Sequence, residues 1–135
     1  MENHIQFVDL VTAKNMKQLG FKEKCLAFFA FSDKKCHLNI CDNLWHEHKN
    51  NTTTCHAASW EHAEYWLLKE GIWIQIEYTP YEERQFGYSF HMNGECVLMT
   101  ETSNTNIDAR KAGIADAIQR MVNIKSFNQF RWACS

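Results

Sequence analysis

The side chains best suited to chemistry are the cysteines and histidines between positions 36 and 56, and the chemistry would be zinc binding. The candidate ligands are Cys36, Cys41, His46 and His48, with His37, Cys55 and His56 close by in the sequence. Zinc prefers four nitrogen or sulfur ligands in a tetrahedron. However, the sequence has no C-x2-C knuckle, and two cysteines five residues apart on one strand would point to opposite faces. We therefore predict no metal site and no cofactor.

A nucleophilic thiol is the second chemistry that the sequence could support. His91 and Cys96 flank the turn residues Asn93-Gly94, so a hairpin would place them opposite each other. Nucleophilic catalysis also requires a third group that orients the base, and the sequence suggests none here. No glycine-rich phosphate loop is present, and the Glu82-Glu83 pair is typical of a charged turn. The sequence therefore predicts no catalytic residues and a protein that is not an enzyme.

The element that organises the chain is a predicted helix followed directly by a strand, SWEHAEYWLLKEGIWIQIEY, over residues 59–78. Ser59 is a suitable N-cap, and Gly71 can end the helix in a left-handed turn. Apolar residues then alternate with others from Ile72 to Thr79, which is the period of a strand. We expect the apolar face of this unit to form core.

Other elements are expected on both sides of that unit. A short helix is predicted over residues 9–21, and strands over 25–32 and 36–41 are predicted to form a hairpin. Residues 42–58 are predicted to form a polar loop that Trp45 anchors. Loops of this length are uncommon in small domains.

A second hairpin and a final helix complete the prediction. The hairpin would pair Phe90 with Val97 and Tyr88 with Met99 on a buried apolar face. The helix is expected from Asn106 to Val122, and Gly113 within it suggests a close backbone approach.

These elements indicate an α+β fold of order α-β-β-loop-α-β-β-β-α. We predict an antiparallel sheet of about five strands with helices packed on one face. Residues 1–122 would form a single domain. Residues 123–135 would be an aromatic tail that packs on the domain or binds a partner.

Composition agrees with a water-soluble protein. The chain has 135 residues, of which 45% are hydrophobic and 22% charged. Its apolar runs are shorter than the roughly 20 residues of a membrane helix, and residues 1–10 lack a signal-peptide pattern. We therefore expect a cytoplasmic protein without membrane contact, whose six cysteines are reduced.

Two resemblances suggest what such a domain does. The predicted order helix, three strands, helix and the wording ARKAGIADAI at residues 109–118 resemble a double-stranded RNA-binding domain. That family uses a basic cluster at the start of its last helix to hold phosphates. The positions that match here contain only Arg110 and Lys111, beside Asp108, and the matching loop TPYEERQFG is acidic. Nucleic acid is therefore an unlikely partner, because phosphate contacts dominate nucleic-acid affinity.

A broader resemblance covers roughly residues 8–122. The segments AKNMKQLGF, SWEHAEYWLLKEGIWIQI and DARKAGIADAI are similar to a family of small uncharacterised proteins from bacteriophages and mobile elements of Bacteroidetes. The resemblance implies an intracellular accessory protein, phage-encoded and active in the bacterial host cytoplasm.

The leading hypothesis is thus a non-enzymatic protein that binds a host protein or sequesters a small ligand, and a homodimer is possible. A nucleic-acid-binding module is the alternative. The predicted binding residues are aromatic or basic: Trp45, Arg110, Lys111, Phe130 and Trp132.

Overall fold

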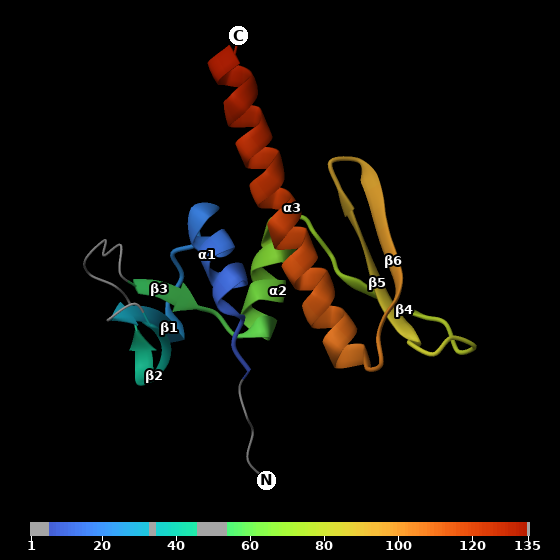
Figure 1. Ribbon diagram of the computed structural model, residues 1–135, viewed down its shortest axis with the longest axis horizontal. Helices are drawn as coiled ribbons and strands as arrows, with labels where there is room; N and C mark the ends of the chain where they lie inside the picture. Colours follow the sequence, from blue (N-terminus) through green and yellow to red (C-terminus); the bar gives the residue numbers. More distant parts are fainter. Residues whose placement is uncertain (1–5, 33–34, 46–53, 135) are drawn as a thin grey trace. The chain divides into compact units, whose positions relative to one another are not determined.

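The computed structural model describes residues 6–32, 35–45 and 54–134, and side chains over most of that length (Figure 1). The α+β class is confirmed. The described elements follow the order α1-β1-β2-β3-α2-β4-β5-β6-α3. They fall into two compact units, residues 1–62 and residues 63–135. The single domain predicted over residues 1–122 stays a prediction.

The first unit contains a short helix and a three-stranded sheet. Helix α1 covers Leu10–Gln18, and the strands are β1 (Cys25–Ser32), β2 (Lys35–Trp45) and β3 (Thr54–Ala57). The antiparallel pairing of β1 with β2 confirms the first predicted hairpin. The strand order is β2-β1-β3. Strand β3 was not predicted, because the polar sequence of residues 42–58 has no strand period. The end of that segment becomes a strand because it pairs with β1.

Helix α1 lies within the predicted range, and local interactions bound it. Asp9 caps the helix by accepting a hydrogen bond from the Thr12 amide at 2.9 Å. Gly20 has a φ of 94°, in the left-handed region that glycine adopts without cost. The chain then turns so that Phe21 is buried.

The second unit contains the other sheet. Helix α2 (Trp60–Lys69) leads into it, and the strands are β4 (Gln75–Tyr78), β5 (Phe86–Met92) and β6 (Glu95–Ser103). Their order is β4-β5-β6, with antiparallel neighbours throughout. The single sheet of about five strands is therefore wrong. The hairpin neighbours β1–β2, β4–β5 and β5–β6 pair with each other, and β3 pairs with β1, so each group of three strands forms its own sheet.

Helix α2 is bounded as predicted. The Ser59 hydroxyl accepts from the His62 amide at 3.1 Å, and Gly71 has a φ of 86°. Trp66, Leu67 and Ile74 are buried, which confirms most of the predicted core face, but Tyr78 at its end is 58% exposed. The strand begins only at Gln75 and not at Ile72.

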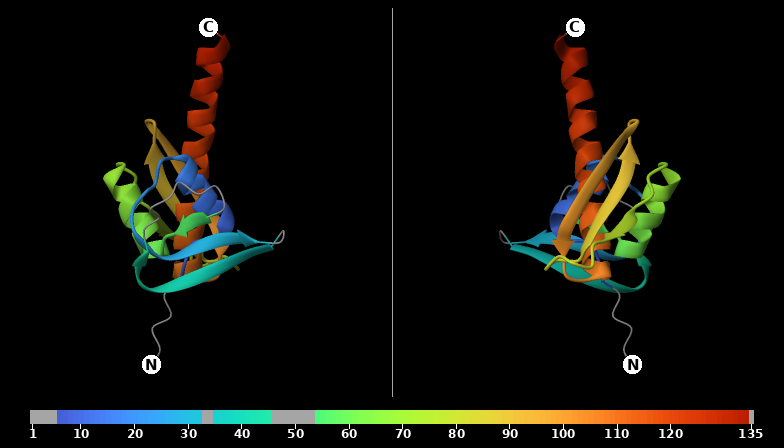
Figure 2. Two further views of the ribbon diagram at one scale, coloured as in Figure 1. Left: turned by 90° about the vertical axis from the view of Figure 1, so that its left-hand side faces the viewer. Right: turned by 90° about the vertical axis from the view of Figure 1, so that its right-hand side faces the viewer.

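Helix α3 (Asn106–Cys134) covers one face of the second sheet, and the right-hand view of Figure 2 shows that sheet in front of it. Gly113 permits the contact, since a Cβ there would lie 2.8 Å from Ile74 Cγ2 and 3.0 Å from Tyr88 Cγ. The close approach predicted at Gly113 is confirmed. The helix end predicted at Val122 is wrong, because α3 continues through the tail.

Candidate functional site

The predicted metal ligands do not form a described site. Cys36 and Cys41 lie on β2, whereas His46 and His48 lie outside the described residues. Among the residues whose placement is described, no three His, Cys, Asp or Glu side chains are grouped to hold a metal ion.

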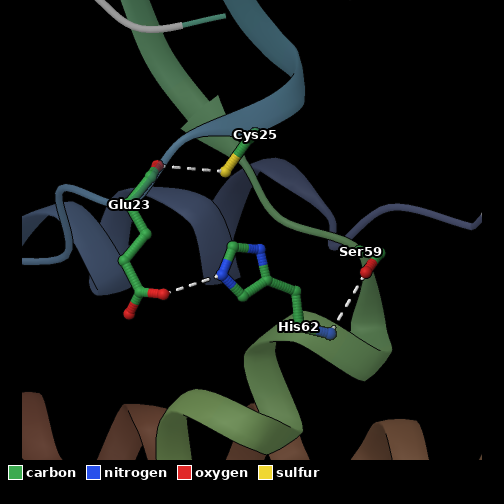
Figure 3. Close-up of polar contacts among 4 residues, drawn as sticks. All are labelled: Glu23, Cys25, Ser59 and His62. Carbon is green, nitrogen blue, oxygen red and sulfur yellow. Dashed lines mark hydrogen bonds and ion pairs between the residues drawn. The ribbon is translucent and has the colours of Figure 1, made fainter. Parts of the chain in front are cut away.

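The first unit contains a small polar cluster that the sequence did not indicate (Figure 3). His62 Nε2 lies 3.0 Å from Glu23 Oε1, and the Phe21 ring meets the His62 ring edge-on at 5.4 Å between centroids. The Cys25 thiol donates to the Glu23 carbonyl oxygen at 3.4 Å. These contacts join the segment before β1 to the first turn of α2. Glu23 and His62 are 39 residues apart, so sequence spacing carries no signal for their pairing.

Cys25 is not a reactive thiol despite its histidine-containing surroundings. Burial raises the pKa of Cys25 to about 12, with smaller contributions from Glu23 and Cys55. The nucleophile is the thiolate, and at neutral pH this thiol remains protonated. The cluster therefore contains no thiolate at neutral pH.

The raised pKa predicts how stability changes in alkali. In the unfolded chain Cys25 loses its proton near its ordinary pKa of 9.0, while in the folded chain it keeps the proton up to about pH 12. The free energy of unfolding should therefore fall between these values, by at most about 1.4 kcal/mol per pH unit for one proton.

Urea titrations at pH 8 to 11 check this expectation. In the Cys25→Ala variant, the free energy of unfolding should fall less steeply with pH than in the unsubstituted protein. The Cys96→Ala variant, which removes an exposed thiol, should keep the original slope. Equal slopes in both variants would contradict the assignment. Burial and the hydrogen bond to Asp116 also raise the pKa of Tyr88, so some slope remains in every variant.

The predicted basic residues lie near the start of α3. The Arg110 guanidinium forms an ion pair with Glu64, with Nη1 and Oε2 2.5 Å apart. Lys111 is half-buried on the same helix. A phosphate that bound Arg110 would therefore have to compete with the Glu64 carboxylate.

The predicted aromatic binding residues lie at the ends of elements. Trp45 is the last residue of β2, and Phe130 and Trp132 lie in the final turns of α3. Their side chains are outside the described part of the structure. Their role in binding stays a prediction.

The second sheet presents a hairpin whose register is the one predicted. Asn93 and Gly94 both have positive φ, at 53° and 77°, and they close the turn between β5 and β6. Phe90 pairs with Val97, and His91 pairs with Cys96. The last two residues are exposed, and the described contacts do not include a group that orients the histidine.

One part of the hairpin prediction is wrong. Tyr88 and Phe90 on β5 are buried beneath α3, but Met99 on β6 is 42% exposed and Val97 is half-buried. The reason is position: β5 is the central strand, whereas β6 is an edge that α3 contacts less.

The outer edge of β6 is an accessible feature of the second unit, since most residues from Glu95 to Met99 are exposed. Within the described residues, β6 pairs with β5 alone. Met92 and Glu95 close the two-residue turn, and hydrogen-bonded and non-hydrogen-bonded pairs alternate from there. The main-chain N–H and C=O groups of Cys96 and Leu98 consequently point away from β5.

A bulge limits this edge at its far end. Phe86 pairs with Ser103 and Tyr88 with Met99, so three residues of β6 oppose Gly87 alone. Glu101 within the bulge has a φ of 59°. The regular edge therefore runs from Glu95 to Met99.

Exposed apolar side chains accompany the edge. Leu98 is 57% exposed on the sheet face away from α3, opposite Ser89. The sequence predicts the hairpin but does not indicate this site. The available signal was the Asn-Gly turn followed by a strand that no further strand succeeds.

Comparisons with known proteins found no matching family model, no similar curated protein and no similar solved structure. Both resemblances described above therefore stay predictions. The described helices include none with the length and apolar character needed to cross a membrane.

Proposed function

We propose that this protein is a non-enzymatic binding protein, and that it takes an extended segment of a partner protein as a fourth strand along β6. The observation that carries the proposal is the outer edge of β6, which no other described strand pairs with, beside the exposed Leu98 side chain. Such strand addition draws affinity from main-chain hydrogen bonds and specificity from alternate side chains. It fits the accessory role expected from the phage resemblance, with a host protein as partner.

A protein segment fits this edge better than a small ligand does. Cys96 and Leu98 each offer an outward main-chain donor and acceptor, spaced along the edge as in a β-ladder, which an extended backbone matches. Each added hydrogen bond contributes about 0.5–1.5 kcal/mol net. The short edge and its exposed leucine favour weak, reversible binding, with a Kd on the order of micromolar for the best segments.

The Leu98→Pro substitution tests the proposal. Proline has no N–H, and the Leu98 N–H points outward, so the ladder to β5 is preserved. The probe is a yeast-displayed library of random nine-residue peptides, from which binders of the unsubstituted protein are selected. We expect Leu98→Pro to bind the selected peptides at least 10-fold more weakly, with a melting temperature within a few degrees of the original.

The control is Leu98→Ala, which keeps the N–H and removes most of the side chain. It should lose less affinity than Leu98→Pro, because the backbone contact remains. Selected peptides that bind Leu98→Pro and the unsubstituted protein equally well would refute the edge as the binding site. The edge would also be refuted as the binding site if the selection enriched no peptide above the background of yeast cells that display no peptide.

Nucleic-acid binding is the second candidate. The order α2-β4-β5-β6-α3 supports it, as do the five Lys and Arg residues against two acids between positions 106 and 131. The Arg110–Glu64 ion pair weighs against it. A titration with duplex RNA at low ionic strength decides: the absence of salt-sensitive binding removes this candidate.

A further inference from the structure

Resting on the proposed function, we infer that the segment bound along β6 has an apolar centre flanked on both sides by lysine or arginine. Glu95 and Glu101 are exposed near the two ends of β6, with Leu98 midway between them. An added strand would place its own central side chain beside Leu98 and one flanking side chain opposite Glu95. Its other flanking side chain would come near Glu101, which lies in the bulge just past the regular edge. Opposite charges in neighbouring positions across strands are favourable.

The charge of the surrounding sheet has the same sign. Residues 75–103 contain five glutamates and one arginine, a net charge of −4 with histidine neutral. On the Leu98 face, the Glu77 carboxylate accepts a hydrogen bond from the Ser89 hydroxyl at 2.7 Å. This hydrogen bond does not neutralise the negative charge of Glu77. A field of one sign raises the association rate of an oppositely charged partner.

The same charges disfavour a second copy of this chain as the occupant. Antiparallel self-pairing of β6 centred on Leu98 would bring Glu95 of one copy toward the bulge that carries Glu101 of the other. Like charges in such positions are destabilising. A partner with basic flanks avoids that cost. We therefore do not expect a homodimer through β6, and the test below would detect one.

The test begins with the sequences of the peptides selected from the random library. We expect enrichment of lysine and arginine at both flanks and of valine, isoleucine or similar residues at the centre. One selected peptide is then synthesised with its basic residues and with glutamine in their place. At low ionic strength, the glutamine version should bind at least 10-fold more weakly, and 0.5 M NaCl should reduce that difference, because salt screens exposed charges.

Charge reversal on the protein supplies the matched measurement. The double variant Glu95→Lys/Glu101→Lys should bind the basic peptide at least 10-fold more weakly. The control Glu82→Lys/Glu83→Lys makes the same change in net charge in the exposed β4–β5 turn, and it should change the affinity less than 3-fold. If the first variant does not fold, the glutamine peptide still tests the same contact.

The outcomes separate this inference from the proposed function. Peptides that need the Leu98 N–H but have neutral or acidic flanks would overturn the inference and leave strand addition standing. Peptides insensitive to Leu98→Pro would overturn both. Sedimentation equilibrium can also show a dimer that Leu98→Pro dissociates. Such a dimer would assign the edge to a second copy of the chain and overturn the inference of a partner segment with basic flanks.

Discussion

Phe90→Ala is expected to lower the free energy of unfolding by about 3–5 kcal/mol, the range for deleting a buried phenylalanine side chain. Phe90 is 1% exposed on the central strand β5. Its ring lies parallel to that of Tyr88, with 6.1 Å between centroids and 5° between planes. Removal of the ring leaves a cavity beneath α3. Urea denaturation, monitored by tryptophan fluorescence, measures this decrease in the free energy of unfolding.

The matched control is Val97→Ala, which truncates the residue paired with Phe90 across the hairpin. Val97 is half-buried on the edge strand, so a loss of only about 1 kcal/mol is expected. Equal losses for the two variants would show that the core of the second unit does not lie where α3 meets β5.

Among glycine-to-alanine substitutions, Gly87→Ala is expected to be the most destabilising, and it should lower the free energy of unfolding by about 3 kcal/mol or more. A Cβ at Gly87 would overlap the Met99 carbonyl oxygen and lie 2.7 Å from Thr100 Cα. Both neighbours are backbone, so relief requires the bulge itself to move. Overpacking typically costs about 1–3 kcal/mol, and a fixed backbone places this case at or above the upper end.

Gly20→Ala separates this steric cost from conformational strain. Gly20 has a φ of 94° but open space around its Cβ position, so alanine should cost about 1–2 kcal/mol there. Thermal and urea denaturation of both variants give the comparison. A loss at Gly87 no larger than that at Gly20 would contradict the close backbone approach. Gly87→Ala should also weaken peptide binding, since the bulge sets the end of the β6 edge.

Local patterns predicted much of the architecture because the interactions behind them are local. Asp9 and Ser59 cap helices through amides three residues away, and Gly71 ends α2 through its own φ. The Asn-Gly turn determined the register of the β5–β6 hairpin in the same way. Each of these outcomes depends on a few neighbouring residues.

The candidate site depended on contacts that local patterns do not encode. The division of the six described strands into two sheets follows from which edges meet, and β3 is a strand because it pairs with the edge of β1. Likewise, Leu98 and Phe90 are both apolar residues in predicted strands, yet one is exposed and the other is core.

The sequence by itself determined the caps, the turns, the apolar face of α2 and the register of the second hairpin. Only the tertiary structure decided that Arg110 is paired with Glu64, that Cys25 is a protonated core thiol, and that β6 is an edge. The physical reason is that burial and pairing are properties of residues brought together from distant positions. Periodicity reports which side chains share a face, but not what covers that face.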